Sequence, residues 1–267
     1  MSIPFQLEGS VAVLTGAGSG IGRSTARALA RCGARVVVSD IDEARAQETA
    51  ALVRSEGGDA VSLAVDVGSD ADLVRLRDLC LTTYGRVDVV VNNVGVIAMG
   101  PPETLPLEAW QRVLDLNVLG IVRSNLAFLP LLLEQGRGHI VNTASASGLL
   151  AYGFDRLPYV ASKHAVVGLS ESLALYLGTR GVGVTCVCPS GVATNIVEQI
   201  TFYGAATSPR APQHRVVGPD EVGELIAAAV SEGRFLVVTA PEIHDELVSR
   251  ATDPEGYLRR LIEEQGS

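Results

Sequence analysis

An apolar run followed by a glycine-rich turn near the N-terminus restricts the possible folds more than any other part of the chain. Residues 11–14 (VAVL) are continuously apolar, as expected of a strand covered on both faces in a parallel sheet. The segment TGAGSGIG at residues 15–22 follows, and residues 23–31 are predicted to form a helix. A strand, a glycine-rich turn and a helix in this order are typical of the start of a dinucleotide-binding fold.

The glycines of this turn have a specific physical task. Glycine lets the backbone turn tightly and approach a pyrophosphate, whose charge is stabilised by amide groups and by the positive end of the helix. The spacing is Gly-xxx-Gly-x-Gly, and the commoner Gly-x-Gly-x-x-Gly pattern does not occur in this turn. The cofactor contacts expected in the turn are Gly16, Ser19, Gly20, Ile21 and Gly22.

An acidic residue stands at the end of the second predicted strand, residues 35–39. This residue, Asp40, follows Gly16 by 24 positions, near the spacing at which a carboxylate reaches the adenosine ribose. A carboxylate there accepts hydrogen bonds from the ribose hydroxyls and repels a 2′-phosphate. The neighbouring Ile41 is also an expected cofactor contact and offers no cation, so NAD is favoured over NADP. Alternatively, Asp40 caps the helix predicted at 42–55, a role that Asp42 could also fill.

Two further predicted strands end in residues suited to binding adenosine. Residues 60–65 lead into Asp66 and Val67, and residues 87–91 lead into a segment with Asn93 and Gly95. Ligands of open parallel sheets bind at the carboxyl ends of the strands. We expect Asp66 to accept from the adenine amino group, Val67 to pack on the ring, and Asn93 and Gly95 to admit the adenosine. Each could equally be an ordinary turn residue.

Strands and helices alternate along the rest of the chain. Right-handed crossovers between them predict an α/β fold: a single doubly wound, Rossmann-type parallel sheet of about seven strands with helices on both faces, in one domain over residues 1–267. The remaining predicted helices are 70–84, 107–134, 157–177, 219–230 and 241–264, and the remaining strands are 139–143, 182–187 and 234–239.

Tyr159 and Lys163 lie four residues apart within a predicted helix, so both side chains lie on one helix face. A cation beside a phenol favours the phenolate and lowers the tyrosine pKa from about 10. Such a tyrosine can pass a proton to or from an alcohol oxygen. This spacing also occurs by chance on many helices.

Composition and charge exclude several other functions. Lys plus Arg is 21 and Asp plus Glu is 30, giving a formal charge of −9, and no basic run suggests a nucleic-acid partner. The four cysteines form no CxxC pair and no histidine stands at metal-ligand spacing, so no metal is expected. The N-terminus lacks signal-peptide features. No apolar stretch is expected to reach the length needed to span a bilayer, because Pro130 interrupts the most apolar segment. We therefore expect a cytoplasmic protein without a membrane partner.

With these features, the chain resembles the short-chain dehydrogenase/reductase family over nearly its whole length. The resemblance implies a tetrad of Asn117, Ser145, Tyr159 and Lys163, with Ser147 as an alternative serine in the same loop. The motifs that carry it are TGAGSGIG at 15–22, Asp66-Val67, NNVG at 92–95, Leu116-Asn117-Val118, Ser145, Tyr159-xxx-Lys163 and residues 189–194.

The resemblance also implies a reaction, reversible hydride transfer between NAD and a secondary alcohol or ketone. Tyr159 would act as the acid or base, Lys163 would lower the pKa of Tyr159 and hold the nicotinamide ribose, Ser145 would bind the substrate oxygen, and Asn117 would help to hold a water.

Further expected cofactor contacts lie after the sixth strand, at Pro189, Val192 and Thr194. The sequence departs from the family pattern at Val94, where alanine is usual, and at Pro189-Ser190-Gly191, where Pro-Gly is usual.

Two apolar segments favour a hydrophobic substrate that is aromatic, terpenoid or steroid-like. They are the run at 149–154 and the start of a predicted lid at 195–217, and core packing would explain either one. The rival functions are an NADP-dependent carbonyl or ketoacyl reductase and a non-catalytic NAD sensor. The resemblance also implies a homotetramer or homodimer built from the helices at 107–134 and 157–177.

Overall fold

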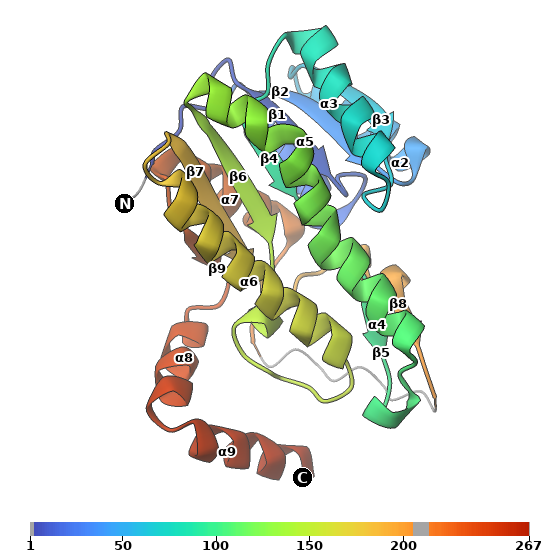
Figure 1. Ribbon diagram of the computed structural model, residues 1–267, viewed down its shortest axis with the longest axis vertical. Coiled ribbons are helices and arrows are strands. Elements are labelled where there is room, and N and C mark those ends of the chain that lie inside the picture. Colours follow the sequence, from blue (N-terminus) through green and yellow to red (C-terminus); the bar gives the residue numbers. More distant parts are fainter. Residues whose placement is uncertain (1–2, 205–213, 267) are drawn as a thin grey trace.

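Seven parallel strands form one sheet in the order β3-β2-β1-β4-β6-β7-β9 (Figure 1). The computed structural model describes residues 3–204 and 214–266. The chain winds outward in both directions from β1, as in a doubly wound Rossmann-type sheet, so the predicted fold class is confirmed. The strands are β1 (Val11–Thr15), β2 (Arg35–Asp40), β3 (Ala60–Ala64), β4 (Val89–Asn92), β6 (Gly138–Thr143), β7 (Val182–Cys188) and β9 (Leu236–Val238).

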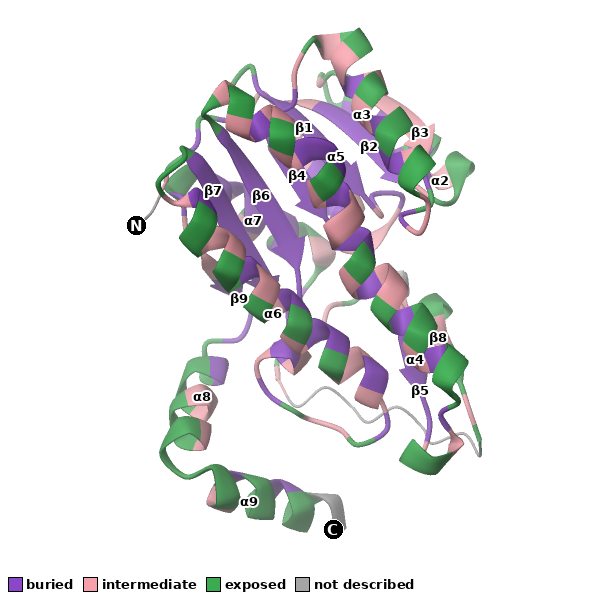
Figure 2. Ribbon diagram, viewed as in Figure 1, coloured by how far each residue is buried: buried purple, intermediate pink, exposed green. Residues whose placement is uncertain are grey.

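Helices cover both faces of this sheet, and the strands between them are buried (Figure 2). Successive strand residues point to opposite faces, so Ala12 and Leu14 of β1 join one core while Val11 and Val13 join the other. This arrangement requires the continuous apolar strands seen in the sequence. One face carries α1 (Gly20–Arg31), α2 (Glu43–Ser55) and α7 (Pro219–Glu232), and the other carries α3 (Asp70–Tyr84), α5 (Gly120–Gln135) and α6 (Leu157–Leu177).

The helix predicted at 107–134 is divided by a π-helical turn. It consists of α4 (Leu107–Leu114), the π turn Asp115–Leu119 and α5. Together these elements, Leu107–Gln135, are long and apolar enough to cross a membrane by length and composition, so the expectation that no segment reaches this length is wrong. Phe128 and Leu132 are buried against the sheet, as in the core helices of soluble proteins that pass the same test. No other helix in the described ranges passes it.

The C-terminal segment predicted as one helix consists of two, α8 (Glu242–Thr252) and α9 (Pro254–Gly266). Proline disfavours the helical conformation of the residue before it, and Asp253 has a φ of −141°. Figure 1 shows both helices beyond the carboxyl ends of the main strands. They contribute Ile243, Tyr257 and Leu261 to a separate apolar cluster with Ala146 and Leu150.

A small second sheet was not predicted. It pairs β5 (Ile97–Met99) with β8 (Ile200–Phe202) in parallel. β8 lies within the predicted lid 195–217, together with the short helix η4 (Asn195–Gln199), while lid residues 205–213 lie outside the described residues. Two other short helices are η1 (Pro102–Thr104) and η3 (Ala146–Gly148).

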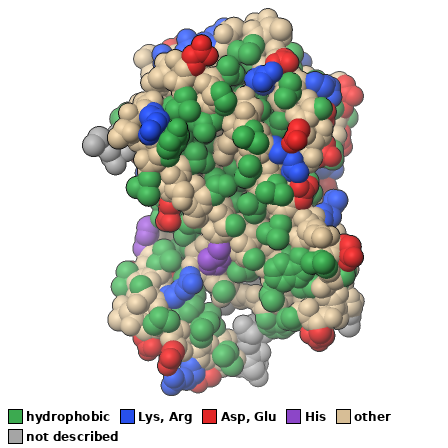
Figure 3. Space-filling view, in the orientation of Figure 1, with side chains coloured by type: hydrophobic (Ala, Val, Ile, Leu, Met, Phe, Trp, Pro, Cys, Tyr) green, Lys and Arg blue, Asp and Glu red, His purple; other side chains and the backbone are tan. Residues whose placement is uncertain are grey.

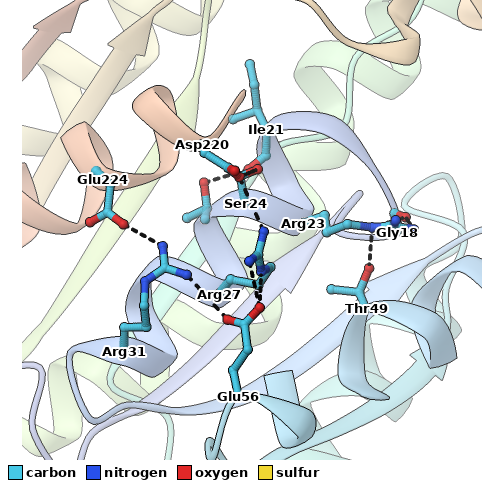
Figure 4. A network of polar contacts seen from close by, with 11 residues as sticks. Gly18, Ile21, Arg23, Ser24, Arg27, Arg31, Thr49, Glu56, Asp220 and Glu224 are labelled. Carbon is cyan, nitrogen blue, oxygen red and sulfur yellow. Dashed lines mark hydrogen bonds and ion pairs between the residues drawn. The ribbon is translucent and has the colours of Figure 1, made fainter. Parts of the chain in front are cut away.

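Charged side chains on α1 connect three helices (Figure 4). Arg27 donates to Glu56 at the end of α2 over 2.7 Å, and Arg31 donates to Glu224 of α7 over 2.5 Å. Arg23 donates to the carbonyl of Gly18 over 2.6 Å. A side chain of α1 thus stabilises the glycine-rich turn that precedes this helix.

Candidate active site

A cavity of about 1020 Å³ lies at the carboxyl ends of the parallel strands. Open α/β sheets bind their ligands at this edge. All but one of the predicted cofactor contacts line the cavity. They are Gly16, Ser19, Gly20, Ile21, Asp40, Ile41, Asp66, Val67, Asn93, Gly95, Tyr159, Lys163, Pro189, Val192 and Thr194.

The exception is Gly22, which does not line the cavity. A Cβ on Gly22 would lie 2.1 Å from the carbonyl oxygen of Gly16, so this glycine lets α1 pack against its own turn. The structure thus gives Gly22 a packing role, and its predicted cofactor contact stays a prediction. Gly16 and Gly20 have φ values of 61° and 51°, a left-handed conformation that favours glycine. The first turn of α1 consequently faces the cavity, where its free amide groups can bind an anion.

Asp40 faces the cavity and also braces the glycine-rich turn. Its carboxylate accepts hydrogen bonds from the amides of Gly18 (2.9 Å) and Asp42 (3.1 Å). Asp42 caps α2, because its carboxylate accepts from the Arg45 amide over 3.1 Å. The capping role that sequence left open between the two aspartates thus belongs to Asp42. The Arg45 side chain forms an ion pair with Glu198 over 2.9 Å.

Lys163 is buried at the floor of the cavity. Its Nζ donates to the carbonyl oxygen of Thr143 over 2.8 Å and lies 5.6 Å from the ring centroid of Tyr159. Burial lowers the pKa of Lys163 from 10.5 to about 8. A Cβ on Gly95 would lie 3.3 Å from this Nζ, so glycine leaves room for the ammonium.

The electrostatics of Tyr159 differ from the sequence expectation. Burial raises the pKa of Tyr159, and a hydrogen bond with Ser145 and the positive charge of Arg156 oppose that increase. The net direction of the shift is opposite to the expected lowering of the pKa, because the loss of solvation around the phenol outweighs the charges near it.

The structure distinguishes between the two candidate serines. Ser145 and Ser147 both line the cavity. Ser145 opposes the increase in the pKa of Tyr159, and its Oγ accepts from the Ser147 amide over 3.1 Å. The geometry favours Ser145 as the serine beside the phenol.

Asn117 lies in the π turn and does not line the cavity. Its Nδ2 donates to the carbonyl of Val96 and to Ser162 Oγ, both over 3.0 Å, and its Oδ1 accepts from the Val96 amide over 2.8 Å. The side chain thus joins the segment after β4 to α6, one residue before Lys163. These hydrogen bonds give the Asn117 side chain a positioning role, and its expected part in holding a water stays a prediction.

Several residues that line the cavity were missed by sequence reasoning. Arg156 donates to Asp155 over 2.8 Å, and its position three residues before Tyr159 was the only local signal. Arg112 also lines the cavity, whereas Tyr152, Glu198 and His214 fall within the segments 149–154 and 195–217 that were predicted to face the substrate.

The predicted apolar walls are only partly present. In the run 149–154, Tyr152 lines the cavity, whereas Leu150 is buried in the cluster that packs against α8 and α9. From the lid, Ile196, Ile200 and Tyr203 line the cavity. Phe202 does not line it and is 44% exposed.

Comparisons with known proteins identify the family of this chain. The family model described as short chain dehydrogenase matches residues 10–202. The probable oxidoreductase EphD of Mycobacterium tuberculosis (strain ATCC 25618 / H37Rv) is 38% identical over 244 residues, which cover 86% of this chain and 41% of EphD. The chain thus spans about two fifths of the length of this relative.

Two other matches cover most of this chain and most of the protein with which it is compared. The cyclohexanol dehydrogenase of Acinetobacter sp. (strain SE19) is 34% identical over 237 residues, which cover 88% of this chain and 93% of that protein. The crystal structure of a short-chain dehydrogenase/reductase from Burkholderia phymatum in complex with NAD is 33% identical, covers 94% of this chain and 96% of that one, and gives a TM-score of 0.84. This chain belongs to the short-chain dehydrogenase family, whose members are oxidoreductases that bind a nicotinamide cofactor.

Proposed function

We propose that this protein is an NAD-dependent oxidoreductase that interconverts a secondary alcohol and a ketone. The observation that carries the proposal is the location of Tyr159, Ser145 and the buried Lys163 in the cavity that Asp40 and the glycine-rich turn also line. The similarity to a cyclohexanol dehydrogenase and to an NAD-bound structure supports it.

The residues of the cavity fit NAD. The left-handed Gly16 and Gly20 open the first turn of α1 toward a pyrophosphate, and the carboxylate of Asp40 suits two ribose hydroxyls. A 2′-phosphate would meet the negative charge of Asp40. The nearby cation of Arg45 is paired with Glu198, which favours NAD over the NADP alternative.

The protein's part in the reaction is positioning and proton transfer, while the nicotinamide supplies hydride chemistry. Tyr159 gives a proton to the ketone oxygen or takes one from the alcohol, and Ser145 holds that oxygen by a hydrogen bond. The Lys163 ammonium has three N–H donors. Thr143 uses one of these donors, which leaves others for the hydroxyls of the nicotinamide ribose.

Apolar side chains of β5 and β8 line part of the cavity and favour a hydrophobic substrate. Ile97 and Ala98 of β5 and Ile200 of β8 line the cavity beside Tyr203. The pairing of β5 with β8 holds these side chains in place. We therefore extend the proposal to hydrophobic cyclic alcohols and ketones, the class to which the substrate named for the Acinetobacter relative belongs.

Replacement of Tyr159 by Phe tests the proposal. The variant should lose at least about 1,000-fold in kcat for secondary alcohols, because it lacks the acid–base group, and should still bind NADH. NAD reduction at 340 nm and NADH fluorescence titration measure the two effects. In the wild-type protein, oxidation should accelerate as the pH rises through the alkaline range, because the raised pKa of Tyr159 keeps the phenol protonated at neutral pH. Near-normal turnover by the variant would contradict the proposal.

A further inference from the structure

A second group of polar side chains lies beside the cavity, apart from the proton-transfer residues. Tyr152 and His214 line the cavity, and Glu246 of α8 stands behind them. His214 Nε2 lies 3.0 Å from the hydroxyl oxygen of Tyr152 and 3.4 Å from a carboxylate oxygen of Glu246. The two rings meet edge to face, with centroids 5.2 Å apart. The proposed reaction uses none of these three residues.

The chemistry of the three groups determines where their protons lie. A carboxylate only accepts hydrogen bonds, so the close approach of Glu246 favours a proton on His214 Nε2. The Tyr152 oxygen, 3.0 Å from that nitrogen, then accepts from it. In this arrangement the hydroxyl hydrogen of Tyr152 has no acceptor among the residues that the structure describes. Tyr152 therefore keeps one hydrogen-bond donor at the cavity wall.

Both side chains are held in place by their surroundings. His214 is 8% exposed, and its segment is tied to the loop that carries Pro189 and Val192. There the Val217 amide donates to Gly191 over 2.9 Å, and the Ala193 amide donates to the Val217 carbonyl over 3.0 Å. Tyr152 packs against the apolar cluster of α8 and α9. A site built on fixed side chains can select a substrate by shape and hydrogen bonding.

The cavity that this donor lines also has apolar side chains in its wall. Ile97, Ala98 and Ile200 line the same cavity. A buried donor that loses water without gaining an acceptor lowers affinity, whereas a substrate oxygen at this point restores the hydrogen bond. The wall thus discriminates between purely apolar substrates and those with an additional oxygen.

We propose that Tyr152, oriented by His214 and Glu246, binds a second oxygen of the substrate. The preferred substrate is then a hydrophobic secondary alcohol or ketone that carries a further hydroxyl or carbonyl group. Tyr152 and His214 determine specificity and take no part in proton transfer to the reacting oxygen. This inference rests on the proposed function, because it names the substrate class of the same site.

The experiment compares cyclohexanol with the cyclohexane-1,2-, 1,3- and 1,4-diols in NAD reduction. The readout is the ratio of kcat/KM for each diol to that for cyclohexanol. In the wild-type protein this ratio should reach about 10 for at least one diol, the equivalent of one additional hydrogen bond. Tyr152→Phe should bring that ratio down toward 1. Tyr176→Phe, which removes a hydroxyl from the outer, 50% exposed part of α6, is the matched control and should keep the wild-type ratio.

A second variant keeps the test decisive if Tyr152→Phe does not fold. Glu246→Gln retains the shape of the side chain but can place an amide donor toward His214, so it should lower the same ratio by a smaller factor. A wild-type ratio near or below 1 for every diol, or a ratio that neither variant changes, would overturn this inference alone while cyclohexanol is still oxidised. Absence of NAD reduction with all four alcohols would count against the proposed function and against this inference with it.

Discussion

Lys163 shows how the environment of a single residue links stability to function. Its ammonium is almost fully buried and has one hydrogen bond to the protein, to Thr143. Its pKa in the folded protein, about 8, lies below the ordinary value of 10.5. Below about pH 8 the folded protein carries a buried charge that the unfolded chain would expose to water. Burial of this lysine therefore costs stability at neutral pH, roughly 3 kcal/mol by the difference in pKa.

Lys163→Met should be more stable than the wild type at pH 7, by about 1–3 kcal/mol, and should lose turnover. Between pH 8 and 10.5 the unfolded wild-type chain binds the additional proton, so wild-type stability rises with pH and the difference narrows. Urea unfolding of both proteins at pH 7 and 9.5 measures the difference in their free energies of unfolding. A difference that does not change with pH, or a less stable variant at pH 7, would contradict the prediction.

Asp40 is the residue on which we expect the choice between NAD and NADP to depend. Asp40→Asn removes the charge that opposes a 2′-phosphate and keeps an oxygen for the Gly18 amide. The ratio of kcat/KM for NAD to that for NADP should fall about tenfold, because a Coulomb repulsion of about 1–2 kcal/mol is lost. Asp42→Asn, at the cap of α2, is the control and should leave the ratio unchanged. A wild-type preference for NADP would refute this interpretation of Asp40.

At the scale of elements, ion pairs hold α1 to its neighbours. Glu56, which follows α2, contacts both Arg27 and Arg31 of α1, and Arg31 reaches Glu224 of α7 (Figure 4). The hydrogen bond from Arg27 lowers the pKa of Glu56 below 4.5. Because the folded-state pKa is lowered, this contribution to stability is present above about pH 4.5 and is lost as the pH falls through the lowered value.

Glu56→Gln should destabilise the protein by about 0.5–1 kcal/mol at pH 7, because the pair is near the surface and screened by water. The difference from the wild type should shrink in 1 M salt and toward pH 3. Denaturant unfolding at two salt concentrations measures it. Glu134→Gln, at an exposed carboxylate of α5, should show no such salt dependence. If both substitutions changed the free energy of unfolding equally, the ion pairs between Glu56 and α1 would not be stabilising.

At the scale of the whole molecule, apolar side chains remain exposed on α5 and α6. Leu126 is 73% exposed, Leu175 is 84% exposed and Tyr176 is 50% exposed. Figure 3 shows hydrophobic side chains gathered over the face that these two helices form in Figure 1. An apolar face of this kind is typical of a protein–protein interface. Assembly into a homodimer or homotetramer through α5 and α6 therefore stays a prediction.

Leu175→Arg should shift the protein to a smaller species in light scattering, because a charge buried in the interface without a partner is unfavourable. Val248→Arg, at a 66% exposed position on α8, is the control and should leave the assembly unchanged. A monomeric wild-type protein at micromolar concentration would refute the predicted interface.

Local patterns explain why much of the fold and cofactor site could be predicted. The apolar strands, the glycine-rich turn and Asp40 at the end of β2 depend on residues close together in the chain, and Tyr159 and Lys163 share a helix. The prediction of elements was wrong or incomplete where the structure depends on more than one segment. Examples are the π turn that contains Asn117 and the pairing of β5 with β8.

Contacts between distant segments explain what the sequence could not reveal. Tyr152, His214 and Glu246 come from three segments, and Asn117 binds Val96 and Ser162 across the fold. The pKa of Tyr159 rises because neighbouring elements exclude water from the phenol. Backbone conformation and the order of apolar and polar residues are encoded along the chain, so the motifs were readable there. Burial, charge environment and the groups that meet at the cavity wall arise only when the elements pack.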